Sequence, residues 1–163
     1  SRKHPLLGQD AWCGFSFLLP EEFPIVDVRL VLSQWKQSGL AGSPLVAQRY
    51  VDGRHYLTIR DLDTRGEWRE VVELPDIVPE RWNDMLFHVR FSAGSDGLVE
   101  VWMNGRRVAR VAGPTASPEG EPRFYHKVGL YRDRMAAPMT VYLDDYALGP
   151  RREDVDPARD GGR

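Results

Sequence analysis

The chain has 163 residues and a formal net charge of −2, from 22 Lys and Arg against 24 Asp and Glu. This length suits one domain that can bury its core without a metal or a disulfide. The nearly balanced charge excludes a global field that would attract nucleic acid or an anionic membrane. Any recognition of anions must therefore come from local clusters of Lys and Arg.

The single cysteine and the short apolar segments bear on whether the chain forms a disulfide or spans a membrane. Cys13 is the only cysteine, so no intramolecular disulfide can form, and its apolar surroundings favour a buried, unreactive thiol. No apolar stretch approaches the roughly 18 residues that span a bilayer, and Ser1–His4 lacks the apolar core of a signal peptide. We therefore expect no nucleic-acid partner and no membrane partner.

The predicted elements are short strands separated by Gly, Pro, Asp and Asn, while helical patterns are nearly absent. The spacing predicts ten strands, at residues 11–19, 28–36, 44–51, 54–61, 68–74, 84–92, 97–104, 106–112, 124–132 and 139–148. The fold class is all-β, an antiparallel two-sheet β-sandwich. We expect one domain over residues 1–149, a disordered tail over 150–163 and, because no long flat apolar face is evident, a monomer.

Two turns have a sequence signature of tight hairpins. Asp52-Gly53 and Asn104-Gly105 each lie between two apolar strands, and glycine accepts the positive φ that a two-residue hairpin requires. With the turn at 95–97, the second hairpin predicts a meander of three strands from about 84 to 112.

Common catalytic signatures are absent from the sequence. There is no Gly-rich phosphate loop, no Gly-x-Ser-x-Gly elbow, no pair of cysteines and no His-x-x-x-His. Nucleotide hydrolysis, the common serine hydrolases and zinc enzymes are therefore poorly supported.

Two predicted strands aim polar groups to one side. In the strand around Trp35, period two places Gln34 and Lys36 together on the opposite face. In 125–132 the same period gathers Tyr125, Lys127, Gly129 and Tyr131 on one face and leaves Val128 and Leu130 for the core. From periodicity alone, an ordinary solvated β face is the simpler interpretation of both.

The segment Tyr-His-Lys-Val-Gly-Leu-Tyr-Arg at 125–132 resembles the Tyr-x-Lys-x-Gly-x-Tyr strand of jelly-roll polysaccharide lyases. These include the alginate lyase, glucuronan lyase and heparin lyase I groups. The segment 34–36 is similar to their Gln-x-His strand, and 10–17, 97–105 and 141–145 resemble further pieces of the glucuronan lyase and heparin lyase I groups, in the same order. The resemblance covers about residues 10 to 149.

The resemblance implies a jelly-roll, concanavalin-like sandwich whose concave sheet binds a uronic-acid-containing polysaccharide and cleaves it by β-elimination. Such a site must neutralise the uronate carboxylate and supply an acid and a base. Gln34 would bond the carboxylate, and Tyr131 would be the acid, or both acid and base. Lys127 would favour the ionised phenol and hold the anionic chain. Tyr125, the first Tyr of the motif, would share or exchange the role of Tyr131.

Two departures from the family pattern bear on catalysis. The usual His of the Gln-x-His strand is Lys36 here, which would neutralise a carboxylate but is a poor base at its ordinary pKa. The family also tends to have an Arg-x-Glu strand ahead of the Trp12 region, where the given sequence has only Ser1-Arg2-Lys3-His4, so we expect that strand and its arginine to be absent from it. A non-catalytic carbohydrate-binding module on the same scaffold is therefore the alternative function, and a structural or interaction sandwich is a third.

Further candidates complete the predicted site. Arg49 and Trp102 would bind substrate, with Trp102 either stacking on a sugar or covering the neighbouring hairpin. Three histidines were considered as substitutes for the missing base: His55, His88 and His126. No cofactor is expected for the chemistry, but Asp144, in the closing Asp144-Asp145 pair, is a candidate ligand of a structural Ca²⁺. By the same resemblance we expect a secreted or periplasmic protein.

Overall fold

The computed structural model describes residues 4–64 and 67–160. Within these residues the chain forms ten antiparallel strands, and all ten were predicted from the sequence. Their bounds are β1 Asp10–Leu18, β2 Leu30–Gln37, β3 Val46–Val51, β4 Arg54–Arg60, β5 Trp68–Glu73, β6 Asn83–Arg90, β7 Leu98–Met103, β8 Arg106–Ala112, β9 Phe124–Arg132 and β10 Tyr142–Gly149.

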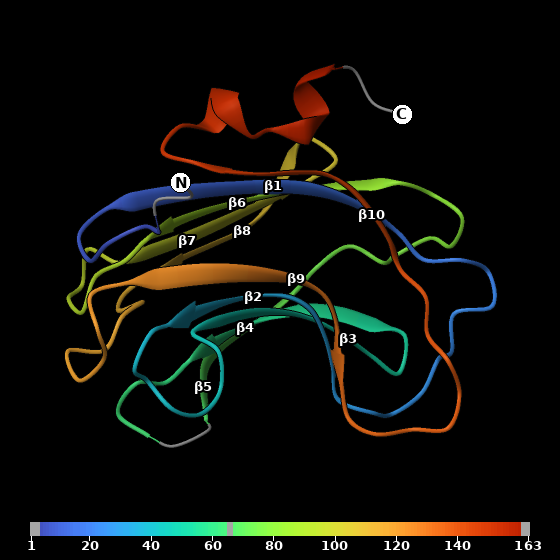
Figure 1. Cartoon of the computed structure of the whole chain (residues 1–163), viewed down its shortest axis with the longest axis horizontal. Coiled ribbons are helices and arrows are strands. Elements are labelled where there is room, and N and C mark those ends of the chain that lie inside the picture. Colours follow the sequence, from blue (N-terminus) through green and yellow to red (C-terminus); the bar gives the residue numbers. More distant parts are fainter. Residues whose placement is uncertain (1–3, 65–66, 161–163) are drawn as a thin grey trace.

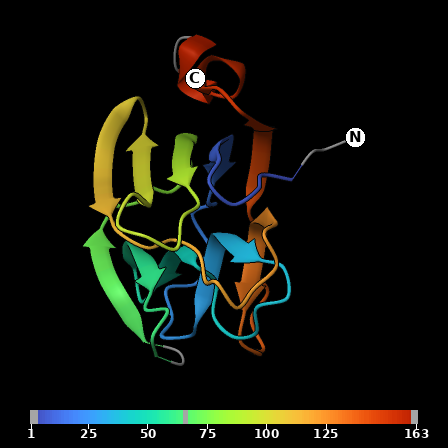
Figure 2. The ribbon, with the colours of Figure 1, turned by 90° about the vertical axis from the view of Figure 1, so that its left-hand side faces the viewer.

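The strands of the described part form two five-stranded sheets that pack face to face, as Figures 1 and 2 show. One sheet has the order β10-β1-β6-β7-β8 and the other β5-β4-β3-β2-β9. The predicted antiparallel two-sheet β-sandwich is therefore confirmed. The second sheet, β5-β4-β3-β2-β9, is called the groove sheet because a groove lies on its outward face.

The two hairpin signatures take the predicted conformation. Asp52 and Gly53 have φ of 51° and 74°, and Asn104 and Gly105 have φ of 53° and 80°. Positive φ at both central residues is the type I′ geometry, whose twist matches that of the strands it joins. These turns fix the β3–β4 and β7–β8 registers.

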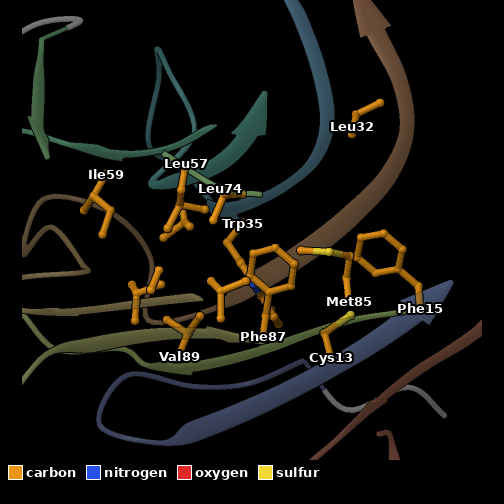
Figure 3. Packing of buried hydrophobic residues seen from close by; sticks show 14 of the residues in the cluster. Cys13, Phe15, Leu32, Trp35, Leu57, Ile59, Leu74, Met85, Phe87 and Val89 are labelled. Atoms are coloured by element: carbon orange, nitrogen blue, oxygen red, sulfur yellow. The ribbon is translucent and has the colours of Figure 1, made fainter. Parts of the chain in front are cut away.

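The core lies between the sheets and is built from the inward-facing residues of each strand (Figure 3). Trp35 and Leu57 come from the groove sheet, and Phe87 and Val89 face them from the other sheet; each is at most 1% exposed. Burying such side chains contributes roughly 1.5–3 kcal/mol apiece. This apolar layer fixes which face of β2 is left to point outward.

The C-terminal segment lies on the outer side of the sheet that contains β1 (Figure 1). Residues 150–160, expected within a disordered tail, include two 3₁₀ helices, η1 Arg152–Asp154 and η2 Pro157–Asp160. Val155 is only 5% exposed. Gly14 allows this close approach, because a Cβ there would lie 1.8 Å from the Val155 carbonyl oxygen.

Across residues 4–64 and 67–160, no helix has the length and apolar character needed to cross a bilayer.

Candidate functional site

A groove of about 470 Å³ lies on the outward face of the groove sheet. Strands β2 and β9, far apart in the sequence, run side by side beneath it (Figure 1). Gln34 lies directly opposite Lys127, and Val31 directly opposite Tyr131. The groove is lined by Arg29, Val31, Gln34, Lys36, Gly42, Ser43, Pro44, Arg49, Trp68, Lys127 and Tyr131.

An irregularity in β2 selects the residues that reach the groove. The register with β3 shifts between Val31 and Ser33, and both Leu32 and Ser33 are buried, at 3% and 2% exposed. Ser33 donates a hydrogen bond to the inward-facing Gln48 (2.9 Å). Because two successive residues turn inward at this β-bulge, Val31 and Gln34 share the groove face.

Gln34 forms part of the groove floor. Gln34 is 7% exposed. Within the part of the chain that the structure describes, its side-chain amide forms no hydrogen bond. A recessed amide with free donors suits a ligand oxygen, since an unmade hydrogen bond there is costly once the ligand excludes water.

Lys36 lies beside Gln34, at the end of the groove formed by the loop after β2. Its Nζ donates to the Gly42 carbonyl oxygen at 3.3 Å. The same loop is held from the other side by Arg60, whose Nη1 donates to the Ala41 and Ser43 carbonyl oxygens. Lys36 thus places a cation where the family pattern has a histidine.

Arg49 reaches the groove from β3. Its Nε donates to Thr58 Oγ1 at 2.9 Å, and its guanidinium carbon lies 4.9 Å from the Trp68 ring centroid. Arg49 is 5% exposed, and this burial lowers the pKa of its guanidinium. Since arginine remains charged at any ordinary pH, the site holds a fixed, partly desolvated cation.

Strand β9 provides the phenols and a further amine. Tyr131 is 54% exposed in the groove. Tyr125 lies opposite Lys36, and the Lys127 Nζ is 5.4 Å from the Tyr125 ring centroid. The structure therefore brings together six of the predicted site residues: Gln34, Lys36, Arg49, Tyr125, Lys127 and Tyr131.

Two groove residues were missed by sequence reasoning. Arg29 precedes β2 and shares the parity of Val31, a signal that was available. Trp68 begins β5 and is 42% exposed; it is the one aromatic residue in an otherwise polar and β-branched strand. Among the described residues, the groove lining with Arg29 included contains four cationic side chains and no carboxylate, although the whole chain is slightly negative.

Trp102, predicted to bind substrate, lies elsewhere. It belongs to β7 in the other sheet, where its ring packs on Trp12 at 5.6 Å between centroids. Arg152 from η1 covers it, with the guanidinium carbon 4.8 Å from the ring. Neither its sheet nor these neighbours connect Trp102 to the groove, so the structure does not bring it together with the other predicted site residues.

Asp144 also lies on the other sheet, opposite Ser16 on β1. Around it the backbone N–H of Asp145 donates to the Asp144 carboxylate at 2.8 Å. Across residues 4–64 and 67–160 there is no group of three or more His, Cys, Asp or Glu side chains that would hold a metal ion. A structural Ca²⁺ at Asp144 therefore stays a prediction from the sequence.

The three candidate histidines do not line the groove. His55 lies inside the sandwich, between Gln48 Nε2 and the Pro75 carbonyl oxygen, and burial lowers its pKa to about 4. The ring of His126 packs on Trp35, with Nδ1 3.3 Å from the Cys13 sulfur; burial lowers its pKa to about 3. His88 is on the outer face of the other sheet with its side chain 14% exposed.

Fold and groove together define a β-sandwich protein with a cationic groove suited to an anionic chain molecule. The chain belongs to the polysaccharide lyase family, whose model matches residues 2–147. The family predicted from the residues is thus confirmed. No curated protein sequence matches the chain.

Solved structures of lyases share the fold. An endo-β-1,4-glucuronan lyase from the fungus Trichoderma reesei has a TM-score of 0.74 and 19% identity, covering 93% of this chain and 73% of its own. A family 7 alginate lyase, A1-II′, has a TM-score of 0.69 and 16% identity, covering 90% and 64%. Alginate lyase PA1167 from Pseudomonas aeruginosa has a TM-score of 0.62 and 19% identity, covering 90% and 68%. The chain thus spans about two thirds to three quarters of these lyases.

Proposed function

We propose that the protein is a polysaccharide lyase that cleaves a uronic-acid-containing glycan by β-elimination in the groove. The observation that carries this proposal is the register of β2 and β9, which sets Gln34 opposite Lys127 and Val31 opposite Tyr131. Membership of the polysaccharide lyase family supports it, as do the acidic substrates named for the similar glucuronan and alginate lyases.

The chemistry assigns a task to each group. A base removes the proton on the carbon next to the uronate carboxylate, a carbon–carbon double bond forms, and the bond to the departing sugar oxygen breaks. That oxygen then takes up a proton. Gln34 would donate its amide N–H to the carboxylate, and Lys36 and Arg49 would neutralise the charge that grows on it as the proton leaves. Tyr131, exposed in the groove, would take the proton and deliver one to the departing oxygen.

The remaining groove residues would bind the polymer. Lys127 and Tyr125 lie along β9, and the half-exposed Trp68 indole forms the opposite wall. No metal ligand set is required, because the four cationic side chains of the groove can balance the carboxylate charge. A polymeric substrate would also favour the secreted or periplasmic location expected from the sequence, and monomers remain our expectation.

A direct assay tests the proposal. Each elimination creates an unsaturated uronate that absorbs in the ultraviolet, so the protein is incubated with glucuronan, alginate and heparin while absorbance is followed. A rise with at least one polymer is expected. No rise with any of them, together with retarded migration in a glycan-containing gel, would instead favour the non-catalytic binding module; neither effect would favour a structural role.

A further inference from the structure

The cation nearest to the Tyr131 ring is not the one that the sequence suggested. Lys127 was expected to act on Tyr131, but its Nζ lies against Tyr125, 5.4 Å from that ring centroid. The guanidinium carbon of Arg29 lies 5.3 Å from the Tyr131 ring centroid. We propose that Arg29, held in place by Asp133, is a positioning residue that stabilises the ionised phenol of Tyr131; this rests on the proposed function.

Strand pairing fixes the position of Arg29. Val31 and Tyr131 are directly opposite each other, and the ladder continues beyond them, because the Asp133 backbone N–H donates to the Arg29 carbonyl oxygen at 3.0 Å. Arg29 and Asp133 are each two residues from the Val31–Tyr131 pair, so their side chains share its face. Arg29 is then the diagonal neighbour of Tyr131, within reach of a long side chain.

Asp133 orients the guanidinium. Its carboxylate accepts a hydrogen bond from Arg29 Nε at 2.9 Å, and the pair raises the pKa of Arg29, with a further contribution from Tyr131. The other charged groups that share the groove with Tyr131 are Lys36, Arg49 and Lys127. Asp133 is therefore the one carboxylate in contact with these cations among the residues that the structure describes.

The need for such a cation follows from the missing histidine. Because Lys36 occupies the usual histidine position and His55, His88 and His126 do not line the groove, Tyr131 would have to accept the proton itself. Only the ionised phenol can do so. A fixed positive charge beside the ring favours that form over the neutral one.

A second Arg–acid–Tyr cluster in the same sheet provides a matched control. Arg54 lies over Tyr56, 4.3 Å from guanidinium carbon to ring centroid, and its Nε donates to Glu73 at 2.6 Å. This Tyr56 is 7% exposed, against 54% for Tyr131. The two clusters share residue types and geometry, but only one has a phenol that a substrate can reach.

The test is the pH dependence of elimination for wild type, Arg29→Gln, Arg29→Lys and Arg54→Gln, on a polymer that wild type cleaves. For Arg29→Gln we expect the rising, acidic limb of the rate profile to move up by about one pH unit, with a rate at neutral pH lowered about tenfold. Arg29→Lys, which keeps the positive charge, should bring the pH profile most of the way back to that of wild type. The profile of Arg54→Gln should match that of wild type. Equal melting temperatures of the Arg29 variants and wild type establish that the fold is intact.

The outcomes separate the two proposals. An active wild type whose profile keeps its position in Arg29→Gln, with the rate unchanged or uniformly lowered, would refute the role of Arg29 and leave the lyase intact. An equal shift in Arg54→Gln would also refute it, because the effect would then be a general one of net charge. A wild type that cleaves no uronate polymer removes the lyase proposal, and this inference with it.

Discussion

Two outward faces of the sandwich carry aromatic and cationic side chains, and they differ in how their charges are paired. In the groove, Lys36, Arg49 and Lys127 have no carboxylate partner within the described part of the chain. On the outer face of the other sheet, Arg90 contacts Asp10, Arg107 contacts Glu100, and His88 lies between both acids, 2.9 and 3.0 Å away. Residue type alone would make either face a candidate site.

The difference indicates what each face is for. Internal pairing leaves little net charge, and exposed pairs of this kind contribute only about 0–1 kcal/mol to stability, so the outer face suits packing of the C-terminal segment. Unpaired cations around a recessed amide repel one another until an anion arrives. This difference in charge pairing supports the proposed binding of an anionic ligand in the groove.

The largest effect is expected from removing a single tyrosine hydroxyl group from the groove, compared with the same change on the other sheet. Tyr131→Phe should lower the elimination rate about 10³-fold, because it removes the hydroxyl group that we propose transfers the proton, and should leave the melting temperature unchanged. Tyr142→Phe is the matched control, since Tyr142 is 53% exposed on β10 of the other sheet. A Tyr131→Phe variant with near wild-type activity would remove this residue from the mechanism.

Lowering the pH should destabilise the protein through two buried histidines of the interior rather than through the charged groups of either face. His55 and His126 have pKa values of about 4 and about 3 in the fold, below the usual value of about 6.5 in an unfolded chain. Each contribution to stability is complete above pH 6.5 and is lost as the pH falls toward the folded pKa, because the unfolded chain takes up a proton first. For His55 the loss by pH 4 amounts to about 3 kcal/mol.

Chemical denaturation between pH 7.5 and 4 measures this loss. In His55→Gln the free energy of unfolding should decline by about 1.4 kcal/mol less per pH unit than in wild type, whatever the constant difference between the two proteins above pH 7. Parallel curves would show that His55 does not titrate as its burial requires.

The local features of this fold could be predicted from the sequence, whereas the long-range pairing of its strands could not be predicted from any single segment. Period-two alternation and the Asp52-Gly53 and Asn104-Gly105 turns are local signals, so all ten strands could be predicted. Which strands become neighbours is not local: the pairing of β2 with β9 came from family resemblance. The position of Trp102 on the other sheet could not be read from its own strand.

The same limit explains which features of the site the sequence did not predict. Alternation alone cannot reveal the bulge at Leu32 and Ser33, which depends on the partner strand β3. The family motif on one strand assigned Lys127 to Tyr131, whereas Arg29 reaches the Tyr131 ring from the neighbouring chain segment that leads into β2. Cross-strand neighbours require a register, and no single segment encodes it.

A smaller effect is expected where the C-terminal segment meets the outer face. Gly14→Ala would place a methyl group 1.8 Å from the Val155 carbonyl oxygen, so the segment must shift. The free energy of unfolding should fall by about 2 kcal/mol, while the elimination rate, which depends on the opposite sheet, should hold. In a chain that ends at Pro150, Gly14→Ala should not lower the free energy of unfolding. An equal decrease in both chains would show that the destabilisation does not come from contact with the C-terminal segment.

The smallest effect tests the comparison most closely, because it concerns the residue for which sequence and structure disagree. Trp102→Leu removes an indole that packs on Trp12 and lies under Arg152, a loss of about 1 kcal/mol in stability, and should leave kcat/KM within about twofold of wild type. Trp68→Leu, the same substitution in the groove wall, should raise KM. If Trp102→Leu raised KM as much as Trp68→Leu, the outer face would bind glycan too, and charge pairing would not distinguish a ligand site from a packing surface in this fold.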